Sequence, residues 1–324
     1  MESQLILNGS LSARGVIASI ASEEKSIGTH SAMAHCGEIL QGVFFDKTGH
    51  LHRGLITLPC PSLSTTADFE PAGEKISVFP PSKTKAAAAA RRTLAHLGLD
   101  GYGGKLTLSS NIPIGLGMGS STSDIVSTIN AVANAFRKRL SPETVAKLSV
   151  ESEVASDSIM FTETIVLFAQ REGVVLEHVG AQLPPLSIVC VNTAPAQTVD
   201  TVSFPPARYT AWEMEAFRSL LAMARKAILT GDASLIGRVA SASARINQRF
   251  LPKPMFSEIE RIAADTGAVG IQVAHSGTVA GLMFDAQNPN VEELVHRASG
   301  ALAKIDMPPF MQFLTREAEY RYAC

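Results

Sequence analysis

The chain has 324 residues, which is enough for two domains of ordinary size. Hydrophobic residues make up 46% of it and charged residues 18%, a composition that builds a buried core and excludes a disordered chain or a coiled coil. With 28 basic and 30 acidic residues the net charge is -2, so nucleic acid and membrane surfaces are poor candidates as partners.

The four cysteines lie far apart in the sequence, with no C-x-x-C spacing: Cys36, Cys60, Cys190 and Cys324. This spacing predicts neither a zinc site nor a disulfide-rich secreted scaffold, and reduced thiols are the simpler interpretation. No apolar run reaches about 18 residues, and the first residues lack the basic start and apolar stretch of a signal peptide. We therefore expect a cytoplasmic protein.

Residues 1–28 show no sustained periodicity and predict an N-terminal extension, to which we assign no role. The segment 31–110 contains short β-type runs, such as 54–58, that are broken by proline and glycine. Between these runs, residues 83–97 predict a helix with an alanine run and a glycine stop. The pattern is mixed β and α.

The stretch after Gly119 predicts a helix, because apolar residues of 125–136 recur on one face. Residues 141–143, Ser-Pro-Glu, predict the start of a second helix with serine as the N-cap and proline in the first turn. Two strand-like runs follow at 164–168 and 174–176.

A Pro-Pro break at 184–185 marks the predicted domain boundary, so residues 29–183 form the N-terminal domain and 184–324 the C-terminal domain. The elements predicted beyond it are a strand at 186–191, helices at 211–229, 233–249 and 256–264, strands at 269–273 and 279–284, a helix at 291–303 and a strand at 311–314. Strands interleaved with helices predict an open sheet with helices on one face.

The most informative segment is P-I-G-L-G-M-G-S-S-T-S, which follows a predicted strand and directly precedes a predicted helix. Its three alternating glycines let the backbone approach a ligand, and the helix start adds free N–H donors. Serine hydroxyls at its end can bind a phosphate oxygen or Mg²⁺. The alternative is a flexible turn that only caps the helix. The residues predicted to bind a nucleotide are Pro113, Gly115, Leu116, Gly117, Met118, Gly119, Ser120, Ser121, Thr122 and Ser123.

Walker A and G-x-G-x-x-G motifs are absent from the chain, as are the protein-kinase motifs H-R-D and D-F-G. The loop instead resembles that of the GHMP kinases, the superfamily named for galactokinase, homoserine kinase, mevalonate kinase and phosphomevalonate kinase. Two further motifs are similar to this family in the right order: A-H-C-G-E-I-L-Q-G at 34–42 and H-S-G-T-V-A-G at 275–281. The resemblance spans about residues 31–315.

Within the superfamily, C-G-E-x-x-Q-G together with H-S-G-T-x-x-G is most similar to the bacterial L-threonine kinases of cobalamin side-chain assembly. Those kinases carry an E-P-T-D-S-x-x-F-like segment, which here reads V-A-S-D-S-I-M-F at 154–161. Valine and alanine replace the acidic residue and the proline. The match to the L-threonine kinases is therefore incomplete in this segment, and the segment does not by itself specify the substrate.

The resemblance implies an α+β fold of two domains, the first of the ribosomal-protein-S5 type and the second ferredoxin-like, with ATP and acceptor in the cleft between them. It implies ATP- and Mg²⁺-dependent phosphorylation of a small hydroxyl compound, L-threonine or a close relative. The alternatives are a GHMP kinase for homoserine, serine or another small alcohol, and a catalytically silent nucleotide-binding regulator. The sequence makes no prediction of the oligomeric state.

Asp157 is the predicted general base, since a hydroxyl that attacks the γ-phosphate must lose its proton. The alternative is an aspartate that ends the preceding helix region. Either Glu151 or Glu153 would supply the Mg²⁺ carboxylate that the family places on this helix, and the alternative is an exposed helix face. We assign the metal to Ser121 and Glu153. Two lysines at a helix start, Lys83 and Lys85, could contact nucleotide phosphates, but we leave them out of the predicted site because such lysines are commonly solvated.

The two outer motifs are predicted to bind the acceptor, because the family uses its N-terminal motif in this way. The residues assigned to it are Gly37, Glu38, Gln41, His275, Ser276, Gly277 and Thr278. For Glu38 the alternative is an ordinary surface strand end. For Gly277 we expect a positive φ in a hairpin turn. In the family the second loop packs against the phosphate loop and closes the site.

Overall fold

The structure is a computed structural model that describes residues 26–195 and 207–316. Of the predicted N-terminal extension only the last three residues are described, and the third of them, Gly28, begins the first strand. Cys324 lies outside the described residues, as do two stretches of the predicted C-terminal domain, 196–206 and 317–324. No helix in the described ranges has the length and apolar character needed to span a bilayer.

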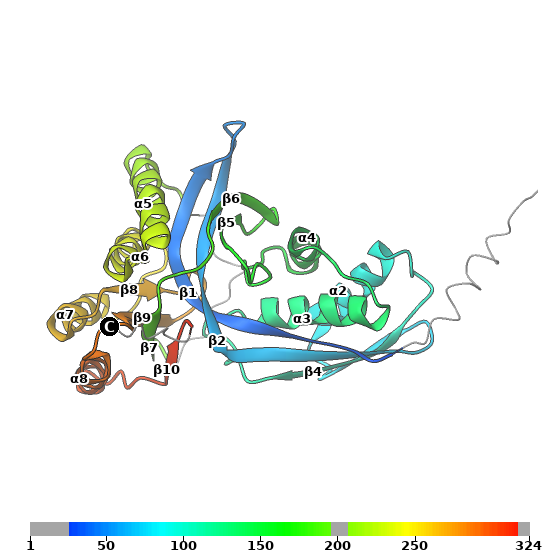
Figure 1. The fold of residues 1–324 in the computed structure, drawn as a ribbon. Helices are drawn as coiled ribbons and strands as arrows, with labels where there is room; N and C mark the ends of the chain where they lie inside the picture. The colour runs from blue at the N-terminus through cyan, green and yellow to red at the C-terminus, as the bar shows by residue number, and fades with distance from the viewer. Residues whose placement is uncertain (1–25, 196–206, 317–324) are drawn as a thin grey trace, which may run out of the picture.

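The described part of the first half, from residue 26 onward, folds into a β-rich layer with three helices beside it (Figure 1). In chain order its elements are β1 (Gly28–Phe45), β2 (Leu51–Pro71), β3 (Ile76–Phe79), α2 (Thr84–His96), β4 (Gly104–Ser110), α3 (Ser120–Ala135), α4 (Pro142–Glu153), β5 (Ile165–Ala169) and β6 (Val174–Gly180). Helix α4 begins as predicted, because the Ser141 side chain accepts the Thr144 N–H at 3.2 Å and a proline occupies the first turn.

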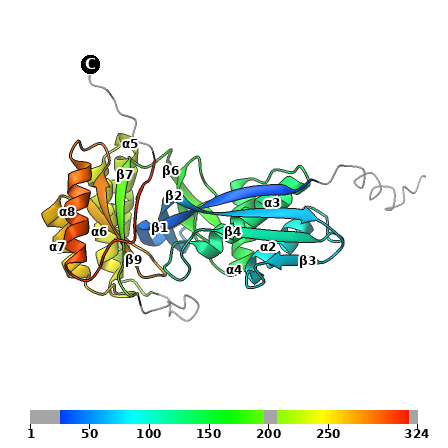
Figure 2. The same ribbon diagram turned by 90° about the horizontal axis from the view of Figure 1, so that it is seen from below.

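The second half interleaves strands with four helices. Its elements are β7 (Leu186–Asn192), α5 (Ala211–Thr230), α6 (Ala233–Asn247), α7 (Phe256–Thr266), β8 (Gly270–Val273), β9 (Val279–Asp285), α8 (Val291–Ala303) and β10 (Met311–Leu314). The four helices gather on the outer side of these strands, away from α2, α3 and α4 (Figures 1 and 2). This arrangement is the open sheet with helices on one face that the sequence predicts.

One sheet runs through both halves, in the order β10-β7-β9-β8-β1-β2-β4-β3, with β5 and β6 joined to it through β2. Only the β3–β4 pair in this sheet is parallel among the described strand pairs. Strand β1 connects the halves, because it pairs with β2 on one side and, at Glu38, with Val273 of β8 on the other. The chain itself crosses between the halves at 181–185, where we placed the domain boundary; the exact boundary stays a prediction.

The prediction of short β runs in the segment 31–110 is confirmed for the run 105–109, which lies in the seven-residue strand β4, but was wrong for β1 and β2. Strands β1 and β2 have 18 and 21 residues and pair over almost their full length. Three register shifts interrupt the pairing, between Met33 and Ala34, between His35 and Glu38, and between Glu38 and Leu40. Such bulges let a strand continue past glycine and proline, which the sequence pattern treats as strand ends.

Helix α3 carries the predicted loop at its N-terminus and lies against the long strand pair. Its apolar face is buried, with Ile125 and Ile129 fully covered in a cluster that also contains Leu55 of β2 and Phe168 of β5. Burial of such side chains contributes roughly 1.5–3 kcal/mol each. The packed helix therefore fixes the position of the loop relative to β1.

Candidate active site

The predicted phosphate loop has the backbone that anion binding requires. Gly115, Gly117 and Gly119 have φ of +84°, +81° and +73°, values that residues with a side chain rarely adopt. Gly119 is the N-cap of α3, and no side chain caps this helix. The first N–H groups of α3, at Ser120 and beyond, are therefore available to a ligand at the positive end of the helix dipole.

The loop is held by the 275–281 motif, as the resemblance implied. The carbonyl of Leu116 accepts the N–H groups of Thr278 and Val279, at 3.1 and 3.3 Å. The two backbones touch: a Cβ on Gly117 would lie 2.6 Å from the Gly277 Cα, and a Cβ on Gly277 would lie 2.0 Å from the Leu116 carbonyl oxygen.

The prediction of a positive φ at Gly277 was wrong, since this residue has an ordinary negative or extended φ. Glycine is required there for the close approach of two loops and not for a turn conformation. At Gly37 of β1 both reasons apply, because its φ is +69° and a Cβ would lie 2.0 Å from the Gln272 side chain.

Two hydroxyl groups of α3 meet a carboxylate from α4. Ser121 Oγ donates to Glu153 Oε2 at 2.6 Å and Thr122 Oγ1 donates to Glu153 Oε1 at 2.9 Å, while Lys85 Nζ lies 3.6 Å from Glu153 Oε2. Burial raises the pKa of Glu153, against the lowering effect of the hydroxyl bonds and of Lys85. Hydroxyl and carboxylate oxygens are the donors that Mg²⁺ prefers, so these residues fit this ion.

The structure distinguishes between the two glutamates that the sequence left as alternative metal ligands. Glu153 has a side chain that is only 5% exposed and contacts the helix α3 hydroxyls. Glu151 is exposed on α4 and has no hydrogen bond or ion pair with a described residue. The geometry therefore favours Glu153 as the metal ligand of this helix.

A second group of side chains, the acidic-histidine cluster, is formed by His35, Glu38, Asp157 and His275. His35 Nε2 lies 2.9 Å from Asp157 Oδ2, and His275 Nδ1 lies 2.9 Å from Glu38 Oε1. Two longer contacts close the cluster, His275 Nδ1 to Asp157 Oδ1 at 3.9 Å and His35 Nδ1 to Glu38 Oε1 at 3.8 Å. Glu38 is 2% exposed, so it is not the surface strand end of the alternative interpretation.

Opposite charges in the cluster shift the pKa values of its members. Burial alone would lower the pKa of His35, but the charge of Asp157, its hydrogen bond and Glu38 together raise the pKa to about 9. Burial would raise the pKa of Asp157, and the charge and hydrogen bond of His35 outweigh it, so that the pKa lies below its usual range. Three of these groups bring ligand atoms within 4.8 Å of one another, as metal ligands do. The raised pKa of His35 favours its protonated form, so its contact with Asp157 is an ion pair.

The cluster and the phosphate loop are in direct contact. The His35 N–H donates to the Met118 carbonyl at 3.2 Å, and a Cβ on Gly119 would lie 2.3 Å from the His35 ring. Thr122 Oγ1, which bonds Glu153, also lies 3.3 Å from Asp157 Oδ2. One threonine hydroxyl therefore joins the predicted metal ligand to the predicted base.

Several predicted residues occupy supporting positions. Met118 is buried in the core, and the Ser123 hydroxyl donates to the Met33 carbonyl at 2.8 Å, so neither side chain faces the loop opening. Gln41 contacts helix α6 through its backbone, with Ser243 and Asn247, and no described residue of the cluster contacts its side chain. Its assigned role, like the other site assignments, stays a prediction.

One member of the cluster was not assigned from the sequence, and one omitted lysine has a buried partner. His35 lies inside the quoted motif but was not assigned, although it directly precedes Cys36-Gly37-Glu38. Lys83, which we left out, forms an ion pair with buried Asp124 at 2.5 Å, and Asp124 also accepts from Thr65. The sequence carries no signal that shows whether a lysine at a helix start is solvated or forms a buried ion pair.

The segment between the two carboxylates is strained. Val154, which directly follows Glu153, has φ of +76° and is 77% exposed. Positive φ in a β-branched residue costs about 1–3 kcal/mol and is concentrated at functional sites. The strained residue thus lies between the predicted metal ligand and the predicted base.

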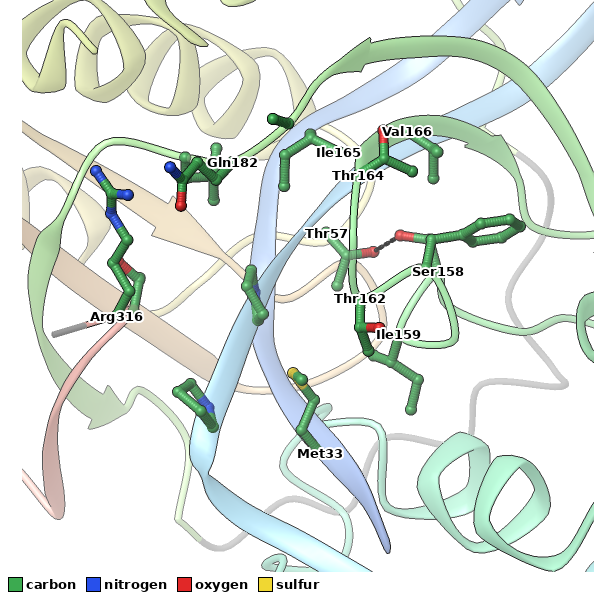
Figure 3. Close-up of a pocket in the computed structure, with 16 residues that line it drawn as sticks. Met33, Thr57, Ser158, Ile159, Thr162, Thr164, Ile165, Val166, Gln182 and Arg316 are labelled. Atoms are coloured by element: carbon green, nitrogen blue, oxygen red, sulfur yellow. Dashed lines mark hydrogen bonds between the residues drawn. The ribbon is translucent and has the colours of Figure 1, made fainter. Parts of the chain in front are cut away.

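A cavity of about 210 Å³ is lined in part by residues that neighbour the cluster in the sequence or in the sheet, but by none of its four members (Figure 3). Thr57 of its wall pairs with Glu38 in the β1–β2 ladder, and Ser158, the residue after Asp157, donates to Thr57 Oγ1 at 3.0 Å. Figure 3 shows Met33 and Ile159 on the same side of the hollow as this hydroxyl pair. The wall next to the cluster thus combines hydroxyl groups with apolar side chains.

Comparison with known proteins gives concordant results. The GHMP kinases N terminal domain matches residues 84–162, from α2 to the residues after Asp157. An L-threonine kinase of Salmonella typhimurium is 27% identical over 81% of this chain and 84% of its own length. An L-threonine kinase of Citrobacter freundii is 30% identical over 61% of this chain and 67% of its own length.

The fold is also found in solved structures. A homoserine kinase from Cytophaga hutchinsonii superposes with a TM-score of 0.66 at 15% identity, over 91% of this chain and 96% of that one. This likeness confirms the α+β fold class with two domains that the sequence predicts.

Proposed function

The chain belongs to the GHMP kinase family, and we propose that it transfers the γ-phosphoryl group of ATP to the hydroxyl of a small amino acid, L-threonine in the first place. Membership makes it a phosphotransferase that acts on hydroxyl groups. One observation carries the mechanism: Thr122 Oγ1 contacts both Glu153 and Asp157, at 2.9 and 3.3 Å. The proposed metal ligand and the proposed base are thus adjacent, as in-line transfer requires.

On the nucleotide side, the N–H groups of the loop and of the α3 start bind the phosphates, and the glycines keep the approach open. Ser121 and Glu153 would hold Mg²⁺, which neutralises charge on the phosphates when bound. Contact with Gly277 keeps Gly117 in its left-handed conformation. The loop is therefore formed before the nucleotide arrives, which lowers the entropic cost of binding.

On the acceptor side, ionised Asp157 accepts the hydrogen bond of the substrate hydroxyl and takes its proton as the bond to phosphorus forms. His35 keeps Asp157 in the ionised state, because it supplies the opposite charge at 2.9 Å. A carboxylate with a low pKa is a weak base, so orientation of the hydroxyl is a substantial part of its contribution.

The substrate class follows from the surroundings of the cluster. Glu38 Oε2 is buried and has no hydrogen-bond partner among the described residues, so it is free to bind an ammonium group. The adjacent cavity wall offers the Thr57–Ser158 hydroxyl pair and apolar side chains, which suit a small branched hydroxy amino acid. The names of the two L-threonine kinases support the same choice. With L-threonine as acceptor the product is O-phospho-L-threonine, and we propose a cytoplasmic role in cobalamin side-chain assembly.

A coupled ADP-release assay with Mg·ATP tests the acceptor, using L-threonine, L-serine, homoserine, mevalonate and sugars. We expect the highest kcat/KM for L-threonine. A higher value for homoserine would move the acceptor assignment toward the homoserine kinases that resemble this chain and leave the family assignment intact. Release no faster than with water for every acceptor would favour a silent nucleotide-binding regulator.

A further inference from the structure

A lysine outside the predicted motifs is buried beside the site. Lys253 lies in the loop between α6 and α7 and is 4% exposed. Prolines flank it on both sides, its N–H donates to Gln248 Oε1 at 2.7 Å and its carbonyl accepts the Phe256 N–H at 3.2 Å. The backbone is thus fixed by two rigid neighbours and two hydrogen bonds, and the side chain has a defined starting point.

The ammonium of Lys253 has an incomplete set of partners. Its Nζ donates to the Gly277 carbonyl at 2.6 Å, and within the described ranges no carboxylate lies within 4.0 Å of it. An ammonium has three donors, and a neutral carbonyl cannot balance its charge. Burial lowers the pKa of Lys253 to about 7, because the buried charge has no counter-charge.

The nearby lysines differ from it in this respect. Lys83 pairs with Asp124 at 2.5 Å and Lys85 lies 3.6 Å from Glu153, so both already face a carboxylate. Lys253, by contrast, has no carboxylate partner among the described residues. Because an unpaired buried charge is costly, a fold that retains one beside an active site points to a ligand that completes it.

The position of Lys253 defines what such a ligand can be. Its partner Gly277 lies against Leu116 and Gly117 of the phosphate loop. Two residues before Gly277, His275 contacts Glu38 and Asp157 of the acidic-histidine cluster. The ammonium therefore lies at the junction of the nucleotide side and the acceptor side, next to the backbone that separates them.

We propose that Lys253 binds an anionic oxygen of the molecules that react in this site, either the carboxylate of the acceptor or the phosphoryl group in transfer. The proposal rests on the proposed function for the identity of the acceptor, but not for the anion itself. With the ligand bound, the ammonium would share its donors between the Gly277 carbonyl and the anion, which gives the charge the partner that it lacks in the free protein.

Isothermal titration calorimetry on the full chain can separate the two sources. The variants are Lys253→Met, which removes the charge and keeps the length, and Lys253→Arg, which keeps the charge. Lys226→Met is the matched control, because Lys226 is exposed on α5. The acceptor arm compares L-threonine with L-threoninamide, which lacks the carboxylate, in the presence of a non-hydrolysable ATP analogue. The nucleotide arm compares Mg·ATP with adenosine.

If Lys253 binds the carboxylate, wild type prefers L-threonine over its amide by about 10- to 100-fold, Lys253→Met loses this preference and Lys253→Arg retains part of it. If it binds the phosphoryl group, Lys253→Met loses affinity for Mg·ATP by a similar factor and keeps its affinity for adenosine. Lys226→Met behaves as wild type in both arms.

Equal losses for all four probes, adenosine included, would reduce Lys253 to a structural support of the Gly277 loop and overturn the proposal. Unchanged affinities in both arms would overturn it as well. If wild type binds neither L-threonine nor the amide, the proposed acceptor is wrong, and the nucleotide arm then decides the role of Lys253 by itself.

Discussion

The nucleotide side and the acceptor side of this site are built in opposite ways. The phosphate loop is one continuous stretch of eleven residues whose binding groups are backbone N–H donors and hydroxyls. The acidic-histidine cluster collects four ionisable side chains, three buried and His275 half-buried, from β1, from the segment after α4 and from the loop before β9. The first depends on backbone shape and the second on mutual compensation of charge.

This difference predicts which substitutions abolish the function of each side. A backbone site is lost when a side chain occupies its space, because the surrounding loops cannot move apart without breaking their hydrogen bonds. A charge network fails when one member is removed, since its partner is then left buried without a counter-charge. Substitutions on the two sides should therefore give distinct signatures in binding, turnover and titration.

The largest effect is expected at Gly117. In Gly117→Val the new side chain meets the Gly277 backbone at 2.6 Å and must adopt a φ near +81°. We expect the affinity for Mg·ATP, measured by calorimetry, to fall by about 10³-fold or more, since strain of roughly 4 kcal/mol corresponds to this factor. Gly101→Val is the matched control, because Gly101 has open space and no positive φ. A folded Gly117→Val protein with normal ATP affinity would contradict the assignment of the loop.

Asp157→Asn removes the proposed proton acceptor and keeps its shape. General-base catalysis and orientation contribute about 10²–10⁴-fold, so kcat should fall by about this factor while ATP binding stays near normal. Steady-state kinetics beside calorimetry provide the measurement. A loss below about tenfold would exclude Asp157 as the base, and a parallel collapse of ATP affinity would indicate a metal-ligand role.

The pair of glutamates on α4 offers an internal control. Glu153→Gln should weaken Mg·ATP binding by about 10- to 100-fold, because it removes a charged oxygen from the proposed Mg²⁺ site. Glu151→Gln, an identical change two residues away on the exposed face, should leave both affinity and kcat unchanged. Equal effects of the two substitutions would show that the helix charge, and not a specific ligand, matters for the nucleotide.

The smallest effect concerns the proton on His35. Its imidazole should titrate near pH 9 in wild type by NMR, and in Asp157→Asn the midpoint should fall toward or below 6.5, because burial then outweighs the remaining charge of Glu38. Since the folded pKa is raised, the stability that His35 contributes is complete below pH 6.5 and is lost as the pH rises through about 9. A wild-type midpoint near 6.5 would contradict the ion pair.

The same contrast decides what the sequence could predict. The loop, its helix and the start of α4 were predictable, since a contiguous pattern of Gly, Ser and Pro specifies local backbone conformation. The fold class and the contact between the Gly277 loop and the phosphate loop followed from the family resemblance. The length of β1 and β2 was not predictable, because bulges between strands are set by tertiary pairing and not by local residues.

The cluster shows where sequence reasoning reaches its limit. Asp157, Glu38 and His275 were each named from motifs, but nothing in the sequence brings His35 to within 2.9 Å of Asp157, 122 positions further along the chain. The choice between Glu151 and Glu153 was equally open, because it depends on which face of α4 meets the Ser121 hydroxyl. Lys253 lies in no recognisable motif, and only its burial and its hydrogen bond to Gly277 in the structure identify it as a candidate.

The most direct test of the central claim is to identify the reaction product. A reaction of the full chain with Mg·ATP and L-threonine should be followed by ³¹P NMR, with Asp157→Asn measured in parallel. We expect a phosphomonoester signal of O-phospho-L-threonine that grows in step with ADP in wild type and about 10²–10⁴-fold more slowly in the variant. ADP accompanied only by inorganic phosphate, or no product with any hydroxy amino acid, would contradict the account.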